Sequence, residues 1–182
     1  MKIYVHLAEG FEEIEAITVV DVLRRADLAV ETVSVTGIKE VTGSHRITVR
    51  ADRVFEEIDY EKGVMIVIPG GMPGTTNLEK HNGLIEKIKL YEKQGKWLAA
   101  ICAAPMIFGK LGILKNKTAT SYPGFEEELI GAELSSEPVV QSDKVITSCG
   151  PGTALQFAFK IVEVLKGTEQ ADVLKASMLI CY

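Results

Sequence analysis

A short apolar run passes directly into small residues in the stretch Trp97-Leu98-Ala99-Ala100-Ile101-Cys102-Ala103-Ala104-Pro105. Five apolar residues followed by Cys-Ala-Ala are typical of a buried strand that turns sharply into a helix. Cys102 would then lie at a helix N-terminus, where the macrodipole and free backbone amides lower the pKa of a thiol and favour its nucleophilic thiolate. The alternative is a buried structural cysteine, because free cysteine is among the most buried residue types.

Apolar runs and helical patterns alternate along the rest of the chain. Strand patterns occupy 2–8, 29–35, 64–68 and 98–101, and hairpins are expected within 40–51 and 138–149. Helical patterns occupy 11–25, 83–94, 105–111 and a final helix over 154–165 that stops near Gly167. This alternation predicts an α/β fold with a mostly parallel sheet and helices on both faces. Cys102 would lie at the carboxyl ends of the strands, where such sheets bind ligands.

The composition indicates one globular domain over residues 1–182, with 47% hydrophobic and 25% charged residues. The formal net charge is −5 and no Lys/Arg cluster stands out, so neither nucleic acid nor an anionic membrane is expected as a partner. No apolar stretch approaches the roughly 18 residues of a membrane span, and the N-terminal residues do not resemble a signal peptide. Three cysteines, Cys102, Cys149 and Cys181, lack zinc-ligand spacing and suggest free thiols in a reducing cytoplasm.

Glycine-bearing turns follow three of the predicted strands. They are Gly10, the stretch Pro69-Gly70-Gly71-Met72-Pro73-Gly74, and Gly150-Pro151-Gly152-Thr153. Glycines directly after a buried strand let backbone amides approach a ligand and point at an oxyanion. Phosphate binding is not indicated, because neither a Walker lysine nor a GxGxxG pattern is present. The alternative is that these glycines only form tight turns.

Three acidic residues, Glu12, Glu13 and Glu15, open the first predicted helix. Such residues usually interact with the helix dipole in solvent. Counting back from the apolar positions of the helix, however, places Glu12 and Glu15 at the edge of the apolar face and Glu13 toward the opposite side. A partly desolvated carboxyl has a raised pKa and could donate a hydrogen bond to a thiolate or carry a proton. The spacing leaves Glu12 and Glu15 as alternatives.

Histidine is the usual partner of a catalytic cysteine, and the chain has three: His6, His45 and His81. His6 lies within a strand pattern and is expected to be a core histidine, while His45 and His81 are expected at the surface. None of the three has a sequence context that marks a general base. Three dispersed histidines and isolated cysteines do not predict a metal site either.

Several ordered motifs resemble the ThiJ/PfpI superfamily, in particular its DJ-one branch, and the likeness covers essentially the whole chain. The matching motifs are Ala8-Glu9-Gly10-Phe11-Glu12-Glu13-Ile14-Glu15, Asp21-Val22-Leu23-Arg24-Arg25-Ala26, Val67-Ile68-Pro69-Gly70-Gly71, Ala99-Ala100-Ile101-Cys102-Ala103-Ala104-Pro105 and Thr147-Ser148-Cys149-Gly150-Pro151-Gly152-Thr153.

The resemblance implies a flavodoxin-like sandwich of the class I glutamine amidotransferase type, with Cys102 on a strained nucleophile elbow. It singles out Glu15 as the protonated carboxyl beside the thiolate. It also implies an anion pocket formed by the backbone amides of Gly70, Gly71 and Ala103. Family members are commonly homodimers, with the helix after the first strand near the interface.

Departures from the family pattern bear on the activity. Ala103 stands where the protease-like PfpI branch has histidine, which makes a peptidase the less expected function, and the His-x-Glu pair of glutaminase relatives is absent. Tyr122, before Pro123, occupies a site that is often histidine in the DJ-one branch. His45 stands where relatives often carry arginine, and Cys149 replaces a commonly polar residue. Tyr122, His45 and Cys149 are therefore possible pocket residues.

The resemblance implies a cofactor-independent enzyme that acts on small 2-oxoaldehydes such as methylglyoxal and glyoxal. Cys102 would attack the aldehyde, Glu15 would move protons, and the glycine amides would hold the oxyanion until a hydroxy acid is released. This is glyoxalase III activity, and deglycation is related chemistry, both consistent with a stress-protective role. The alternative is a redox-sensing or chaperone-like oxidative stress protein that uses oxidation of Cys102. Cys149 is then a candidate to resolve oxidised Cys102, and Cys181 is an incidental or dimer-proximal thiol.

Overall fold

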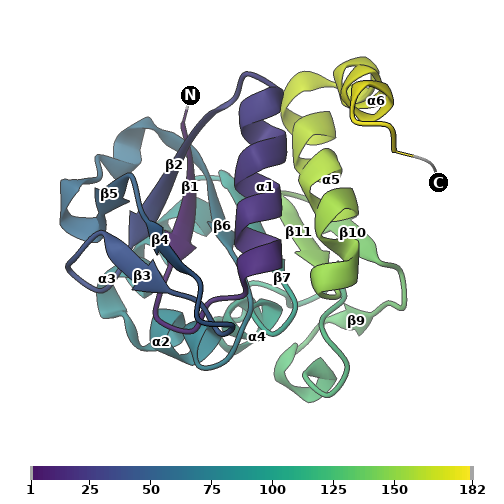
Figure 1. The fold of residues 1–182 in the computed structure, drawn as a ribbon. Coiled ribbons are helices and arrows are strands. Elements are labelled where there is room, and N and C mark those ends of the chain that lie inside the picture. The colour runs from purple at the N-terminus through teal and green to yellow at the C-terminus, as the bar shows by residue number, and fades with distance from the viewer. Residues whose placement is uncertain (1, 181–182) are drawn as a thin grey trace.

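A seven-stranded sheet forms the centre of the computed structural model, which describes residues 2–180 (Figure 1). Its strand order is β10-β11-β7-β6-β1-β2-β5, and every neighbouring pair is parallel except β10–β11. The strands are β1 (Lys2–Leu7), β2 (Ala29–Ser34), β5 (Arg53–Val54), β6 (Gly63–Ile68), β7 (Trp97–Ile101), β10 (Val139–Ser142) and β11 (Val145–Ser148). The predicted mostly parallel α/β sheet is confirmed.

Helices cover both faces of this sheet. On one face α1 and α5 pack side by side, with α6 against α5 (Figure 1). On the other face lie α2, α3 and α4. The helices are α1 (Glu13–Arg25), α2 (Gly74–Lys80), α3 (Asn82–Lys93), α4 (Pro105–Lys110), α5 (Ala154–Lys166) and α6 (Thr168–Ser177).

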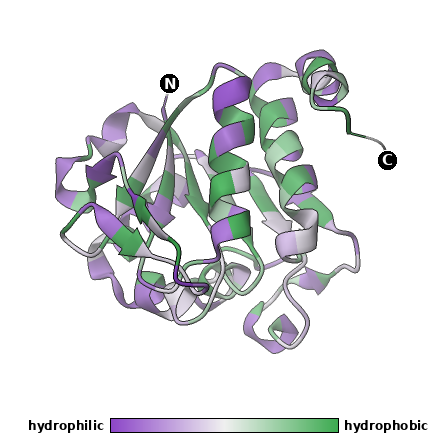
Figure 2. Cartoon of the chain, viewed as in Figure 1, coloured by the Kyte–Doolittle hydropathy of each residue, from purple (hydrophilic) through white to green (hydrophobic). Residues whose placement is uncertain are grey.

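The central strands bury side chains on both faces, which explains their nearly continuous apolar sequences. Along β1, Ile3, Val5 and Leu7 pack toward α1 and α5, while Tyr4 packs on the opposite side. Figure 2 shows the apolar residues concentrated along these strands and on α5. Each large apolar side chain that is fully buried stabilises the fold by roughly 1.5–3 kcal/mol. The two cores hold the strand ends in fixed positions at the edge where Cys102 lies.

Short elements complete the structure. The antiparallel hairpin of β3 (Glu40–Thr42) and β4 (Thr48–Arg50) confirms the predicted arm, and β10–β11 confirms the second hairpin. A small separate sheet pairs β8 (Thr118–Ala119) with β9 (Glu133–Leu134). Single turns of 3₁₀ helix lie at Phe55–Glu57, Tyr60–Lys62, Glu126–Glu128 and Pro151–Thr153.

The structure corrects several predicted boundaries. The first helix begins at Glu13, because Glu12 is still extended at the N-cap position. The helix that was expected to be the last ends at Lys166, as the stop at Gly167 requires, but Gly167 also precedes the further helix α6. Helix α2 was missed because it begins inside the glycine-rich stretch 69–74, and β5, β8 and β9 were missed because each contains only two residues.

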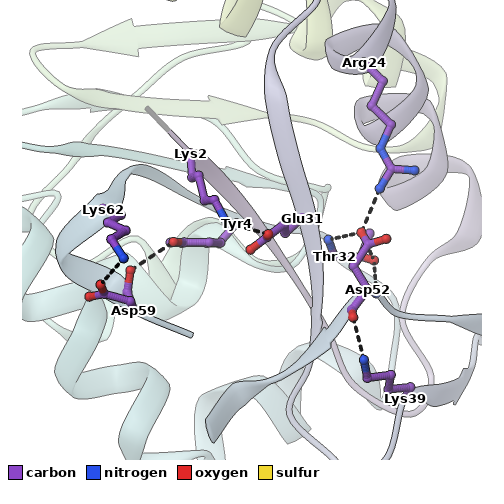
Figure 3. A network of polar contacts seen from close by, with 9 residues as sticks. All are labelled: Lys2, Tyr4, Arg24, Glu31, Thr32, Lys39, Asp52, Asp59 and Lys62. Atoms are coloured by element: carbon purple, nitrogen blue, oxygen red, sulfur yellow. Dashed lines mark hydrogen bonds and ion pairs between the residues drawn. The ribbon is translucent and has the colours of Figure 1, made fainter. Parts of the chain in front are cut away.

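Asp52 ties strand β2 to helix α1 and to Lys39, which precedes the β3–β4 hairpin (Figure 3). Its Oδ2 accepts hydrogen bonds from Arg24 Nη2 at 2.7 Å and from the backbone amide and hydroxyl of Thr32, both at 2.8 Å. The backbone carbonyl of Asp52 accepts from Lys39 Nζ at 2.8 Å. These contacts fix the C-terminal end of α1 on the sheet.

Among the described residues, no helix combines the length and apolar character needed to cross a bilayer.

Candidate active site

Cys102 follows the last residue of β7 in a strained backbone conformation. Its φ is +67°, a left-handed value that is uncommon for a residue with a Cβ. The turn is held from both sides, because the Cys102 amide donates to the Ser148 carbonyl at 2.9 Å and the Tyr122 amide donates to the Cys102 carbonyl at 2.8 Å. Such strain persists only where the surroundings enforce it, and it is common at functional sites. Helix α4 begins three residues later, at Pro105.

Glu15 is fully buried on the first turn of α1. Its Oε2 accepts a hydrogen bond from the Gly70 amide at 2.7 Å, and within the described part of the chain its Oε1 has no hydrogen-bond partner. Burial raises the pKa of Glu15 from 4.5 to about 7, although the hydrogen bonds with Gly70 and Cys102 oppose the shift. The structure therefore brings Glu15 beside the thiol, and Glu12 contributes only a small electrostatic effect.

Gly70 allows the carboxyl and the thiol to approach each other. A Cβ atom on Gly70 would lie 2.5 Å from Cys102 Cβ, 2.8 Å from Glu15 Oε2 and 3.0 Å from Cys102 Sγ. No side chain fits there without displacing both residues. The absence of a side chain at position 70 therefore defines the distance between the two ionisable groups.

The pKa of Cys102 is raised to about 12, which contradicts the predicted lowering. Desolvation is the main cause, and the negative charge of Glu15 and its hydrogen bond to the thiol add to it. The amides of Ala103 and Gly71 act in the expected direction but are outweighed. Because a thiol with a raised pKa is protonated at neutral pH, the reactive thiolate forms when its proton passes to Glu15.

The three amides of the predicted anion pocket have different partners. The Gly70 amide donates to Glu15, whereas those of Gly71 and Ala103 interact with the Cys102 sulfur. Gly71 has φ +89°, and a Cβ there would clash with the backbone carbonyl oxygen of Gly10 at 2.6 Å. Gly71 and Ala103 are therefore placed to stabilise negative charge near the sulfur, while Gly70 orients the carboxyl.

Glu13 and His45 join the N-terminus of α1 to the β3–β4 hairpin. Glu13 accepts from the His45 amide at 2.8 Å, from the Ile47 amide at 3.4 Å and from His45 Nδ1 at 2.9 Å. Burial by itself would raise the pKa of Glu13, but these hydrogen bonds outweigh it and lower the pKa. The hydrogen bond to Glu13 and the charge of Glu12 raise the pKa of His45. The prediction that Glu13 lies toward the side opposite the apolar face is wrong, because Glu13 is buried against the hairpin residues His45 and Ile47.

Glu12, Glu13 and His45 also place one potential metal ligand atom each within 4.8 Å of one another. All three are already engaged in the hairpin contact, since Ser44 Oγ donates to Glu12 at 3.2 Å and His45 lies against both carboxylates. The predicted pocket residue His45 thus contacts the carboxylates at the helix end, and none of its hydrogen bonds involves Cys102 in the described residues.

Tyr122 and Cys149, the other possible pocket residues, lie in different surroundings. The ring of Tyr122 lies against Gly150 and is partly exposed. Cys149 Sγ lies 3.1 Å from Thr120 Oγ1 and 3.5 Å from the Glu137 carbonyl. The hydrogen bonds of Cys149 therefore tie it to the β8 region. Cys181 lies outside the described residues.

The remaining histidines have structural partners. His6 is buried, stacks on Tyr60 and forms a 2.7 Å hydrogen bond between Nε2 and the Tyr60 hydroxyl. Burial lowers the pKa of His6 to about 3, so it is neutral, as expected of a core histidine. His81 is half-buried, and its Nδ1 accepts from the Leu84 amide at the start of α3. Sequence reasoning placed His81 at the surface and missed this capping role, which a histidine just before an apolar helix could have indicated.

Replacing Glu15 by Gln is expected to stabilise the protein at alkaline pH. Because the folded-state pKa exceeds the unfolded one, the native stability falls as pH rises from 4.5 to about 7, and the loss persists above this window. Glu15→Gln keeps an acceptor for Gly70 without the charge. We expect it to exceed the native protein by up to about 3 kcal/mol at pH 8 and to match it near pH 4. Denaturant unfolding at both pH values measures this.

Glu13→Gln is the matched control, with the opposite sign. The lowered pKa of Glu13 contributes stability that is present above its unfolded pKa and is lost as pH falls through its folded pKa. Glu13→Gln should therefore destabilise the protein at pH 8. A Glu15→Gln variant that is less stable than the native protein at pH 8 would contradict the assignment of a raised pKa.

The chain is similar to known proteins over most of its length. Residues 1–164 match the DJ-1/PfpI family profile. Protein dj-1beta of Drosophila melanogaster is 34% identical over 178 residues, covering 97% of this chain and 95% of its own. The glutathione-independent glyoxalase DJR-1.2 of Caenorhabditis elegans is 35% identical over 167 residues, covering 90% and 88%.

The solved structure of oxidised DJ-1 from Toxoplasma gondii superposes with a TM-score of 0.95 and 37% identity, covering 100% of this chain and 99% of that one. The fold predicted from the motifs is thus shared with solved DJ-1 structures. From the family match over most of its length and the identity to full-length relatives, the chain belongs to the DJ-1/PfpI family.

Proposed function

We propose that this protein converts small 2-oxoaldehydes, such as methylglyoxal and glyoxal, into 2-hydroxy acids without a cofactor. The observation that carries the proposal is the contact between Cys102 and a buried carboxyl, Glu15, whose pKa is raised to about 7. Such a carboxyl can accept and return a proton near neutral pH. The name of the Caenorhabditis elegans relative, a glutathione-independent glyoxalase, supports this reaction class.

The first step is addition of the thiol to the aldehyde. The bond between Cys102 Sγ and the aldehyde carbon forms while the π bond of the carbonyl breaks, and the thiol proton moves to Glu15. The amides of Gly71 and Ala103 stabilise the negative charge on the former carbonyl oxygen. Glu15 then donates its proton to that oxygen, which gives a neutral hemithioacetal and restores the carboxylate.

The second stage isomerises the hemithioacetal and releases the acid. Glu15 removes the proton from the carbon bonded to sulfur and returns a proton to the neighbouring ketone carbon. The hydroxyl proton moves to the ketone oxygen, so that a thioester of a 2-hydroxy acid results with no net oxidation. Water then adds to the thioester carbonyl, the carbon–sulfur bond breaks, and Cys102 regains its proton. Deglycation of hemithioacetals and related adducts would use the same groups.

Cys102→Ser is expected to abolish turnover, because a hydroxyl is a far weaker nucleophile under these conditions. The assay measures methylglyoxal consumption and lactate formation in the absence of glutathione and in the presence of a metal chelator. Cys149→Ser is the matched control and should keep the native rate, since Cys149 is tied to Thr120 and Glu137. Normal turnover by folded Cys102→Ser would refute the mechanism.

The same assay addresses the alternative of a redox-sensing or chaperone-like stress protein. Native, reduced protein without turnover would favour that alternative, for which the amides beside the sulfur would stabilise an oxidised, anionic Cys102. Peroxide titration followed by intact mass would then show whether Cys102 is oxidised before the other thiols. A peptidase activity has no support from the site, because Ala103 follows the cysteine.

The pH dependence of kcat/KM is expected to follow the ionisation of Glu15. The rate should rise as pH increases through about 7, because Glu15 then loses the proton that prevents it from accepting one from the thiol. Glu15→Gln should lose this rise and reduce the rate by about 10²–10⁴-fold, while Glu15→Asp should retain part of both. A Glu15→Gln profile identical to the native one would exclude Glu15 as the proton carrier.

We further propose that two copies associate through the outer face of α1. Ile14, Ile17 and Ile47 are exposed there to 56%, 42% and 56%, and they line one hollow together with Val49 and Leu155. Monomeric proteins rarely expose contiguous apolar surface of this kind. A symmetric pair would bury this face of both copies close to the N-terminal end of α1, which carries Glu15.

Ile17→Lys is expected to convert a dimer into a monomer, because a charge at the centre of an apolar interface loses its hydration. Sedimentation velocity over a concentration series measures the change. Ile130→Lys is the control, since Ile130 is also exposed but lies outside this hollow. A native protein that sediments as a monomer throughout the series would contradict the proposed association.

A further inference from the structure

Tyr122 contacts the backbone of Cys102 without belonging to the proton-transfer pair. The Tyr122 amide donates to the Cys102 carbonyl at 2.8 Å, which fixes the Tyr122 backbone on the strained turn. Tyr122 is 46% exposed, which is a large fraction for an aromatic residue. One part of the ring therefore packs on the protein, and the rest is available to a bound molecule.

Gly150 is the surface on which the ring packs. A Cβ atom on Gly150 would lie 3.0 Å from Tyr122 Cδ2 and 3.5 Å from Cε2, and it would meet no other atom within this range. The φ of Gly150 is 166°, an extended conformation that any residue can adopt. The backbone at this position therefore does not require glycine, and the contact that a side chain would disturb is the one with the Tyr122 ring.

The sheet brings Gly150 and Cys102 to the same edge. Strands β7 and β11 are parallel neighbours, with Ile101 paired to Ser148, so both chains leave the sheet at the same level. Cys102 follows one strand directly and Gly150 follows the other after one intervening residue. The Tyr122 ring, which lies beside Gly150, is therefore at the edge of the sheet that also carries Cys102.

The carboxylates near the thiol disfavour a further negative charge on the substituent of a substrate. Glu15 lies against Cys102, and the negative charge of Glu12 acts on Glu15. His45 is engaged by the carboxylates of Glu12 and Glu13. The amides of Gly71 and Ala103 favour negative charge only at the sulfur and the reacting oxygen, while an apolar substituent could pack on the exposed part of the Tyr122 ring.

We propose that the Tyr122 ring, held against Gly150, forms a wall beside the Cys102 thiol and makes the site prefer neutral 2-oxoaldehydes with an aromatic or other bulky apolar substituent. The preference among substrates rests on the proposed function, but the wall can be tested without turnover. Phenylglyoxal is the aromatic probe and methylglyoxal the small one. The ratio of their kcat/KM values isolates the contribution of the substituent from that of the shared aldehyde chemistry.

Tyr122→Ala is expected to lower the phenylglyoxal-to-methylglyoxal ratio by about three- to tenfold, the range typical of an aromatic contact. Tyr122→Phe should keep the native ratio, because it retains the ring. Gly150→Ala should lower the ratio by displacing the ring, yet have no further effect in a Tyr122→Ala background. Gly152→Ala is the matched control, since a Cβ on Gly152 meets nothing within 4 Å.

A second readout uses alkylation of Cys102 by iodoacetanilide and iodoacetamide, which share the reactive carbon and differ by a phenyl ring. Peptide mass analysis distinguishes Cys102 from the other cysteines, and free cysteine supplies the reference ratio. We expect a native preference for the anilide that Tyr122→Ala and Gly150→Ala reduce. Rate ratios unchanged by both substitutions would overturn the proposal. Absence of turnover with both aldehydes would overturn the proposed function instead, and the alkylation ratio would still decide whether the wall exists.

Discussion

The contact of a buried carboxyl with a thiol across Gly70 is the constraint on which the rest of the site depends. Glu15 comes from α1, Cys102 from the turn after β7, and Gly70 from the turn after β6. The three meet only because β6 and β7 are neighbours and α1 packs over their ends. The Gly70 amide holds one oxygen of Glu15, and the missing side chain leaves room for the sulfur.

The same contact sets the electrostatics. Desolvation raises the pKa of both groups, so that burial disfavours the charged form of each. A carboxyl kept near a neutral pKa destabilises the folded state once it ionises, which is an expected cost of a functional site. The two cores on either side of the sheet supply the stability that makes this arrangement sustainable.

Peripheral contacts orient the groups without taking part in the chemistry. Glu13 fastens the β3–β4 hairpin to the N-terminus of α1, two residues before Glu15. The Ser148 carbonyl and the Tyr122 amide hold the Cys102 turn from opposite sides. Each of these contacts joins segments that lie far apart in the sequence. The strain at Cys102 is therefore enforced by the sheet topology and by the loop that carries Tyr122.

The sequence by itself determined the α/β class, the strand before Cys102, the two hairpins and the core position of His6, because local periodicity and turn residues carry that information. Periodicity left Glu12 and Glu15 open and predicted the wrong side for Glu13, and the expected helix N-terminus predicted the wrong pKa direction for Cys102. Only the tertiary structure decided these points, since desolvation and hydrogen bonding depend on segments far apart in the sequence. The contact between the Tyr122 ring and Gly150 was also decided by the tertiary structure. Tyr122 is bonded to the turn after β7, Gly150 follows β11, and these two strands are neighbours.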